Sequence, residues 1–83
     1  MNPRIAQVIA NDDYTLTLTF TNGETAKFDV SPYLDKGIFH ELKDLRYFKL
    51  VKPLLDTVQW PHGQDFCPDT LYEESYKAAV AAD

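Results

Sequence analysis

Residues 14–30 read YTLTLTFTNGETAKFDV, and this stretch decides the fold. Apolar side chains at Tyr14, Leu16, Leu18 and Phe20 alternate with threonines at 15, 17, 19 and 21. A period of two is typical of a strand with one buried face. Asn22–Gly23 then favours a type I′ turn, because both central residues of that turn need a positive φ. The return segment places apolar residues at 26, 28 and 30, so we predict an antiparallel hairpin whose threonine row faces solvent or a partner.

The flanking segments extend this hairpin at both ends. Residues 4–10 predict a first strand, and a turn at residues 11–13 joins it to the second. After the hairpin, Ser31 is expected to cap a helical turn that has Pro32 at its first position and Gly37 at its end. The chain therefore starts as a three-stranded meander and passes into short helical structure.

The second half of the chain predicts further short elements. Apolar spacing indicates a helical piece within residues 38–48. Residues 48–51 and 56–60 predict two short strands around a turn at residues 53–55. A closing helix is expected over residues 70–80. Thr70 and Glu73 would form its capping box, Asp69 would compete as the cap, and its apolar face would hold Tyr72, Tyr76, Ala79 and Val80.

Together these elements predict one small α+β domain over residues 1–83. Its architecture would be an antiparallel β-meander of about five short strands, with short helices and a C-terminal helix on one side. Strands of a meander leave an open edge, and such an edge can pair with a second copy of the chain. The pattern is therefore compatible with a homodimer.

Composition excludes several classes of function. The 83 residues include 8 basic and 13 acidic side chains, for a net charge of −5. This field repels phosphate backbones, so we expect no direct nucleic-acid binding. A single cysteine excludes an internal disulfide and a zinc site with several cysteines. With no signal pattern and no long apolar run, we expect a cytoplasmic protein without membrane contact.

The run WPHGQDFCPDTLY, residues 60–72, raises the question of catalysis. His62, Asp65 and Cys67 invite an assignment as base, orienting group and nucleophile, but nothing in their spacing brings them together. His62 and Asp65 with Asp69 are equally unspecific as metal ligands. We therefore expect a structural loop with no catalytic residue, metal or cofactor.

In this structural interpretation, each residue of the run has an ordinary role. Trp60 packs over the core, Pro61 and Gly63 make a turn, and Cys67 is a small buried hydrophobe. Pro68 and Asp69 open the closing helix. Elsewhere in the chain, Tyr33 and Tyr47 are candidate anchors of a protein–protein contact, and His62 joins them as a candidate of the same surface.

The order of these features resembles a family of small bacterial proteins known as domain of unknown function 2442. The resemblance covers nearly the whole chain and is most specific in the run that contains Trp60, Gly63, Asp65, Pro68, Asp69 and Tyr72. It also rests on Asn22–Gly23–Glu24, Phe28–Asp29–Val30 and the turn from Pro32 to Gly37. Position 62 departs from the family, because asparagine is common there.

The resemblance implies an α+β fold and no established catalytic residue. Short members of the family are often encoded beside another small protein, in an arrangement similar to toxin–antitoxin modules. Longer members carry a helix-turn-helix after this domain. The present sequence ends at Asp83, which agrees with the expectation that it does not read DNA directly.

Two hypotheses of function follow. The first is a non-enzymatic protein–protein interaction module, an antitoxin-like or regulatory partner of a small basic protein encoded by a neighbouring gene. The alternative is a small-ligand-binding domain with its site on the Trp60–Asp65 loop, which requires His62 and Asp65 to converge on an open pocket.

Overall fold

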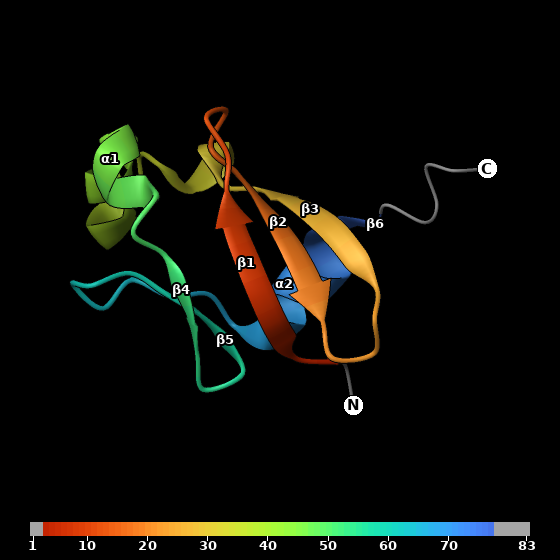
Figure 1. Cartoon of the computed structure of the whole chain (residues 1–83). Coiled ribbons are helices and arrows are strands. Elements are labelled where there is room, and N and C mark those ends of the chain that lie inside the picture. The colour runs from red at the N-terminus through yellow and green to blue at the C-terminus, as the bar shows by residue number, and fades with distance from the viewer. Residues whose placement is uncertain (1–2, 78–83) are drawn as a thin grey trace.

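The computed structural model describes residues 3–77, and its centre is an antiparallel sheet of order β1-β2-β3-β6. Strands β1 (Ile5–Ala10), β2 (Thr15–Phe20) and β3 (Thr25–Asp29) form the predicted meander (Figure 1). The short strand β6 (Tyr76–Lys77) pairs with the far edge of β3.

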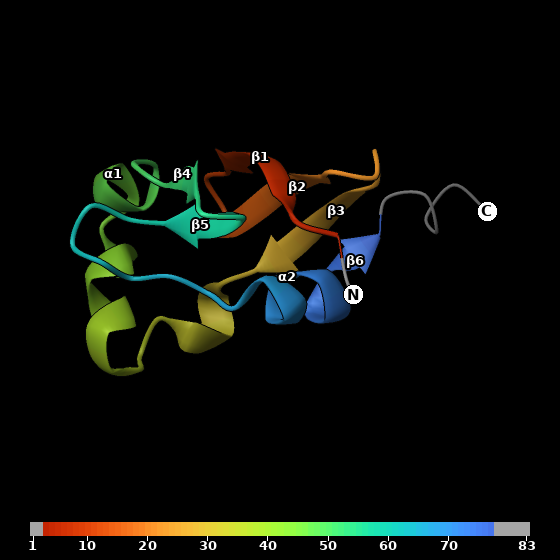
Figure 2. The ribbon, with the colours of Figure 1, turned by 90° about the horizontal axis from the view of Figure 1, so that it is seen from below.

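The remaining elements lie at one end of this sheet and below it. They are η1 (Ser31–Tyr33), η2 (Gly37–Lys43), α1 (Leu45–Phe48), β4 (Lys52–Leu54), β5 (Thr57–Gln59) and α2 (Pro68–Glu74). The hairpin β4–β5 lies beside β1, and η2 with α1 forms a helical lobe at the end of the sheet (Figure 1). Seen from below, α2 runs under the face of the sheet formed by β2 and β3 (Figure 2). The predicted α+β class is therefore confirmed.

The alternation in the opening stretch determines which face of the sheet is buried. Its apolar residues line the core, with exposed fractions of 2% or less at Leu16, Leu18, Phe20, Ala26, Phe28 and Val30. The threonines of β2 are only half-buried on the opposite face. Here the side chain of Asn11 bridges two of them, donating to Thr15 Oγ1 at 3.1 Å and to Thr17 Oγ1 at 3.0 Å.

The turn between β2 and β3 is not the predicted type I′ turn. The loop has three residues, and within it only Gly23 has a positive φ, of 89°. The Gly23 N–H donates to the Phe20 carbonyl at 2.9 Å, and the Phe20 N–H donates to the Glu24 carbonyl at 2.8 Å. A two-residue loop would place Leu18 opposite Lys27, whereas the observed register pairs Leu18 with Ala26. Burial of both apolar sets therefore selects the longer loop.

Several predicted boundaries between residues 31 and 60 are also wrong. Ser31 begins η1 instead of capping it, because its N–H and hydroxyl both donate to Asp29 Oδ1, at 3.0 and 2.7 Å. Gly37, with a φ of 46°, opens η2 as well as ending the preceding turn. Phe48 belongs to α1, since Asp44 caps that helix through the Arg46 N–H, and the fourth strand starts only at Lys52.

The closing helix is shorter than predicted. It begins at Pro68 with Cys67 as the N-cap, so Asp69 and Thr70 lie inside its first turn and the predicted capping box does not form. Proline is favoured at this first position because the N–H that it lacks would have no intrahelical acceptor. The helix ends at Glu74, and Tyr76 lies in β6 opposite Lys27. The predicted helical positions Ala79 and Val80 lie outside the described residues.

Candidate functional site

The loop after β5 repeats the geometry of the turn between β2 and β3. The Trp60 N–H donates to the Gln64 carbonyl at 2.9 Å, and the Gly63 N–H donates to the Trp60 carbonyl at 2.9 Å. Gly63 has a φ of 97°, a conformation that side chains disfavour. This geometry places His62 at the tip of the loop, where its side chain is 65% exposed. The residues two positions before and after it, Trp60 and Gln64, are buried.

A hydrogen-bond network fixes this tip against the helical lobe. His62 Nδ1 lies 2.6 Å from Glu41 Oε2, and Gln64 Nε2 donates to Glu41 Oε1 at 2.9 Å and to the Ile38 carbonyl at 3.0 Å. The Tyr47 hydroxyl donates to Gln64 Oε1 at 2.7 Å and accepts the His62 N–H at 2.8 Å. Gln64, with 2% exposure, is the only buried polar side chain among the described residues. It connects an exposed carboxylate–imidazole pair to the interior.

Two of the three candidate interaction residues meet in this network. The rings of Tyr47 and His62 lie 5.1 Å apart. Tyr33 lies elsewhere: its ring packs against Phe28 and Phe66, and its hydroxyl donates to Glu74 Oε1 at 3.1 Å. Both tyrosines are half-buried, so most of their contacts are internal. His62 is the most accessible member of the predicted surface.

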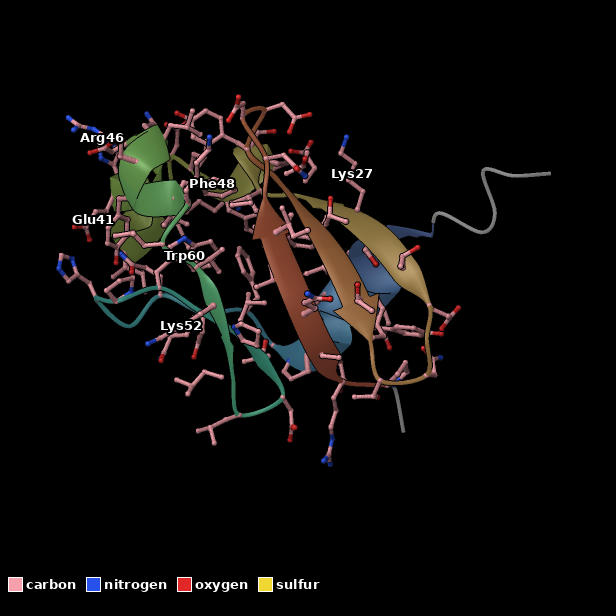
Figure 3. All side chains as sticks on the ribbon, viewed as in Figure 1. Lys27, Glu41, Arg46, Phe48, Lys52 and Trp60 are labelled. Carbon is pink, nitrogen blue, oxygen red and sulfur yellow. The ribbon has the colours of Figure 1, made fainter. Side chains whose placement is uncertain are left out.

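The other residues of the specific run have separate positions. Trp60 is 1% exposed, and Figure 3 shows it directed toward Phe48, away from solvent. Tyr72 packs edge-on against Phe20, with ring centroids 5.0 Å apart, and its hydroxyl donates to Glu24 at 2.7 Å. Asp65 is exposed and pairs with Gln59 through the backbone. Pro68 and Asp69 form the first turn of α2.

Cys67 was predicted to be buried, and this is wrong. Its side chain is exposed at the N-cap of α2, where the chain leaves the core between Phe66 and Pro68. The described contacts of His62 are with Glu41 and Tyr47, so the structure does not assemble a Cys67–His62–Asp65 triad. Within residues 3–77, no three histidine, cysteine, aspartate or glutamate side chains are grouped as a metal site.

The sequence did not reveal Glu41 and Gln64 as members of the network. Glu41 lies in η2 and precedes His62 by 21 residues. No periodic pattern in the sequence relates two irregular segments at that separation. A buried glutamine within a polar loop also carries no signal in the sequence. The contact depends on how the loop folds back over η2.

The environment of Glu41 lowers the pKa of its carboxyl group below the ordinary value of 4.5. The hydrogen bond with His62 is the main cause, followed by the bond from Gln64. Because the folded-state pKa is the lower one, this group adds stability above pH 4.5, and that stability is lost as the pH falls through the folded pKa.

We expect His62→Ala to raise the pKa of Glu41 toward 4.5, because it removes the larger cause of the shift. The measurement is an NMR titration of the Glu41 side-chain carboxyl carbon in the wild type and the variant. His40→Ala is the matched control, since His40 does not contribute to the shift of Glu41. Equal midpoints in the wild type and His62→Ala would mean that the imidazole does not interact with Glu41 in solution.

Comparison with known proteins agrees with the resemblance seen in the sequence. The model of the family described as "Protein of unknown function (DUF2442)" matches residues 5–77. The chain belongs to this family. No curated protein and no solved structure gives a significant match. The matched range of DUF2442 contains all the described strands and helices, including the loop with Trp60 and His62.

The structure also bears on contact with membranes. In the part of this DUF2442 chain that the structure describes, none of the helices has the length and apolar character needed to cross a bilayer.

Proposed function

We propose that this chain is a non-enzymatic protein–protein interaction module that binds a small basic protein. The supporting observation is the distribution of charge. Residues 1–52 carry seven basic and seven acidic side chains, whereas residues 53–83 carry one basic and six acidic ones. The whole net charge of −5 therefore comes from the last 31 residues.

The described part of this acidic stretch displays its carboxylates on the surface. Four acidic residues in and just before α2 are exposed: Asp65, Asp69, Glu73 and Glu74. Asp69 and Glu73 are four residues apart, so they lie on one face of the helix. We call the pair Asp69 and Glu73 the acidic face. Such a concentration of one sign of charge steers a basic partner and accelerates its association.

The proposal includes a regulatory or antitoxin-like role in the cytoplasm, with the product of a neighbouring gene as the partner. This extension rests on the gene arrangement that the family resemblance implies. The alternative, a small ligand bound at the Trp60–Asp65 loop, has less support. It requires His62 and Asp65 to converge, whereas the imidazole contacts Glu41 and Tyr47.

We expect the double variant Asp69→Asn/Glu73→Gln to bind the purified product of the adjacent gene roughly three- to tenfold more weakly than the wild type. The two substitutions remove exposed charge from the acidic face with little change in shape. Isothermal titration calorimetry at two salt concentrations would measure the loss, and the affinity of the wild type should fall as salt rises.

The matched control is Asp12→Asn/Asp35→Asn, which removes the same total charge from two side chains that are 80% and 81% exposed. Its affinity should remain within about twofold of the wild type, because Asp12 and Asp35 lie outside the acidic face. Their exposed ion pairs with Lys49 and Lys43 contribute little to folding stability. If both double variants lose affinity equally, net charge alone matters and the acidic face is not the contact. If the wild type does not bind, the proposed function fails.

A further inference from the structure

The hairpin β4–β5 ends in a turn whose sequence does not suit its backbone. Leu54 pairs with Thr57, which leaves Leu55 and Asp56 as a two-residue loop. Their φ angles are 49° and 75°, the positive pair that defines a type I′ turn. Asparagine, aspartate and glycine are the residues that accept this geometry, and a leucine is strained in it. The chain thus holds a leucine where a small polar residue would be more stable.

Burial does not offset this strain, because Leu55 is 86% exposed and is the most exposed large apolar residue among those described. Its neighbour Leu54 is 39% exposed. Strained residues persist when the surrounding structure holds them, and they are concentrated at functional sites. An exposed leucine in a left-handed turn therefore points to selection for a contact.

Both sides of the turn are fixed. The Asp56 carbonyl accepts the Ile5 N–H at 3.1 Å, and the Asp56 carboxylate lies 3.2 Å from Arg4 Nη1. On the other side, the Thr57 hydroxyl donates to the Phe66 carbonyl, just before α2. The tip is therefore held rigidly and loses little conformational freedom on binding.

We propose that Leu55 is the apolar anchor of the interface with the basic partner, and this inference rests on the proposed function. The partner would present an apolar pocket bordered by lysine or arginine side chains. Charge complementarity supports this occupant. Residues 53–76 contain five acidic residues and no lysine or arginine, and Arg4, the cation at the tip, is already paired with Asp56.

An anionic membrane is a less suitable occupant for the same tip. Insertion of an apolar loop into such a surface is normally supported by surrounding cations. Here the stretch from residue 53 to residue 76, which contains the tip, has no lysine or arginine, and the whole chain carries −5. Figure 3 shows Lys52 at the opposite end of β4 from the turn. A protein pocket with basic borders fits this distribution of charge better.

The test is Leu55→Asn, which gives the turn a residue that accepts a positive φ. The melting temperature should stay the same or rise by a few degrees, whereas the affinity for the purified product of the adjacent gene should fall at least tenfold. Leu55→Gly provides a second variant with the same expectation. Ile38→Asn is the matched control, because Ile38 is also an exposed apolar residue, at 66%, but lies on η2 and not in the turn. The affinity of this variant should stay within about twofold of the wild type.

The outcomes separate the inference from the proposed function. If Leu55→Asn binds as tightly as the wild type while Asp69→Asn/Glu73→Gln binds weakly, the anchor is wrong and the interaction module stands. A clear fall in melting temperature for both Leu55 variants would give the leucine a structural role and overturn the inference. The inference would also be overturned if the wild type bound phosphatidylserine vesicles without any protein partner and Leu55→Asn lost that binding, because the leucine would then anchor the chain to a membrane. If the wild type does not bind the purified partner, both proposals fail.

Discussion

Replacing Trp60 with alanine is expected to lower the free energy of unfolding by about 3–5 kcal/mol. The indole is 1% exposed and packs between Phe48 and Phe66, with ring centroids 5.9 and 6.0 Å away. Its Nε1–H donates to the Phe48 carbonyl at 2.8 Å in the interior. Alanine would leave a large cavity and a buried carbonyl without its donor.

The size of this effect is large for a chain of 83 residues. Typical stabilities of 0.05–0.15 kcal/mol per residue give a total of about 4–12 kcal/mol. Loss of the indole therefore removes a substantial part of the stability, because this one side chain joins α1, the loop after β5 and the core below the sheet. A residue in the most specific run of the family is thus accounted for by packing.

Trp60→Phe separates the two contributions to this loss. Phenylalanine retains most of the apolar contact but removes the N–H donor, so its cost should be smaller, about 1–3 kcal/mol. Both variants lack the only tryptophan, so unfolding in urea should be followed by circular dichroism. A cost below about 1 kcal/mol for Trp60→Ala would contradict the buried position and return Trp60 to the list of binding residues.

The three-stranded meander could be predicted from the sequence because its information is local, whereas β6 falls within the predicted closing helix. Strict alternation from Tyr14 to Thr21 fixed the buried face, and the matching pattern after Gly23 fixed the partner strand. The two-residue loop could also have been rejected from the sequence, because it places Leu18 opposite Lys27, which belongs to the polar set of its strand. The error came from giving the residue preference of Asn22–Gly23 more weight than the burial of two strands.

The segment from Ser31 to Gln59 was less predictable, because its short elements depend on tertiary contacts. Leu55 in this segment, and Tyr14 before it, have a left-handed backbone that opposes the preferences of those residues. In the case of Tyr14, the contacts with the helical lobe explain it: the hydroxyl donates to the Lys43 carbonyl, and the ring lies 5.3 Å from Phe48. Leu55 has no such internal contact, and for this reason it carries a functional inference.

The candidate site shows the same limit. Tyr47 and His62 were identified singly as surface candidates, and the structure brings them together through Gln64 and Glu41. Neither of the two connecting residues has a distinctive spacing in the sequence. A network assembled from η2, α1 and a loop becomes visible only when the fold is known.

Replacing Gln64 with leucine is expected to lower the free energy of unfolding by about 2–4 kcal/mol, although leucine is apolar and similar in volume. The amide makes three hydrogen bonds, to the Tyr47 hydroxyl, the Ile38 carbonyl and the Glu41 carboxylate. Leucine would leave the partly buried Ile38 carbonyl and Tyr47 hydroxyl without these partners, and an unsatisfied group of this kind costs about 1–3 kcal/mol. Gln7→Leu, on the exposed face of β1, is the control and should change stability by less than about 0.5 kcal/mol.

The same substitution also tests whether Gln64 supports the loop tip. Without the amide, the Tyr47 hydroxyl loses one of the bonds that hold it against the His62 N–H. Hydrogen exchange at the His62 amide should therefore become faster in Gln64→Leu than in Gln7→Leu, under conditions where both variants remain folded. Slower or unchanged exchange, together with wild-type stability in urea, would contradict this role of the Gln64 side chain. The loop would then be held by the two backbone hydrogen bonds that close the turn, from the Trp60 N–H to the Gln64 carbonyl and from the Gly63 N–H to the Trp60 carbonyl.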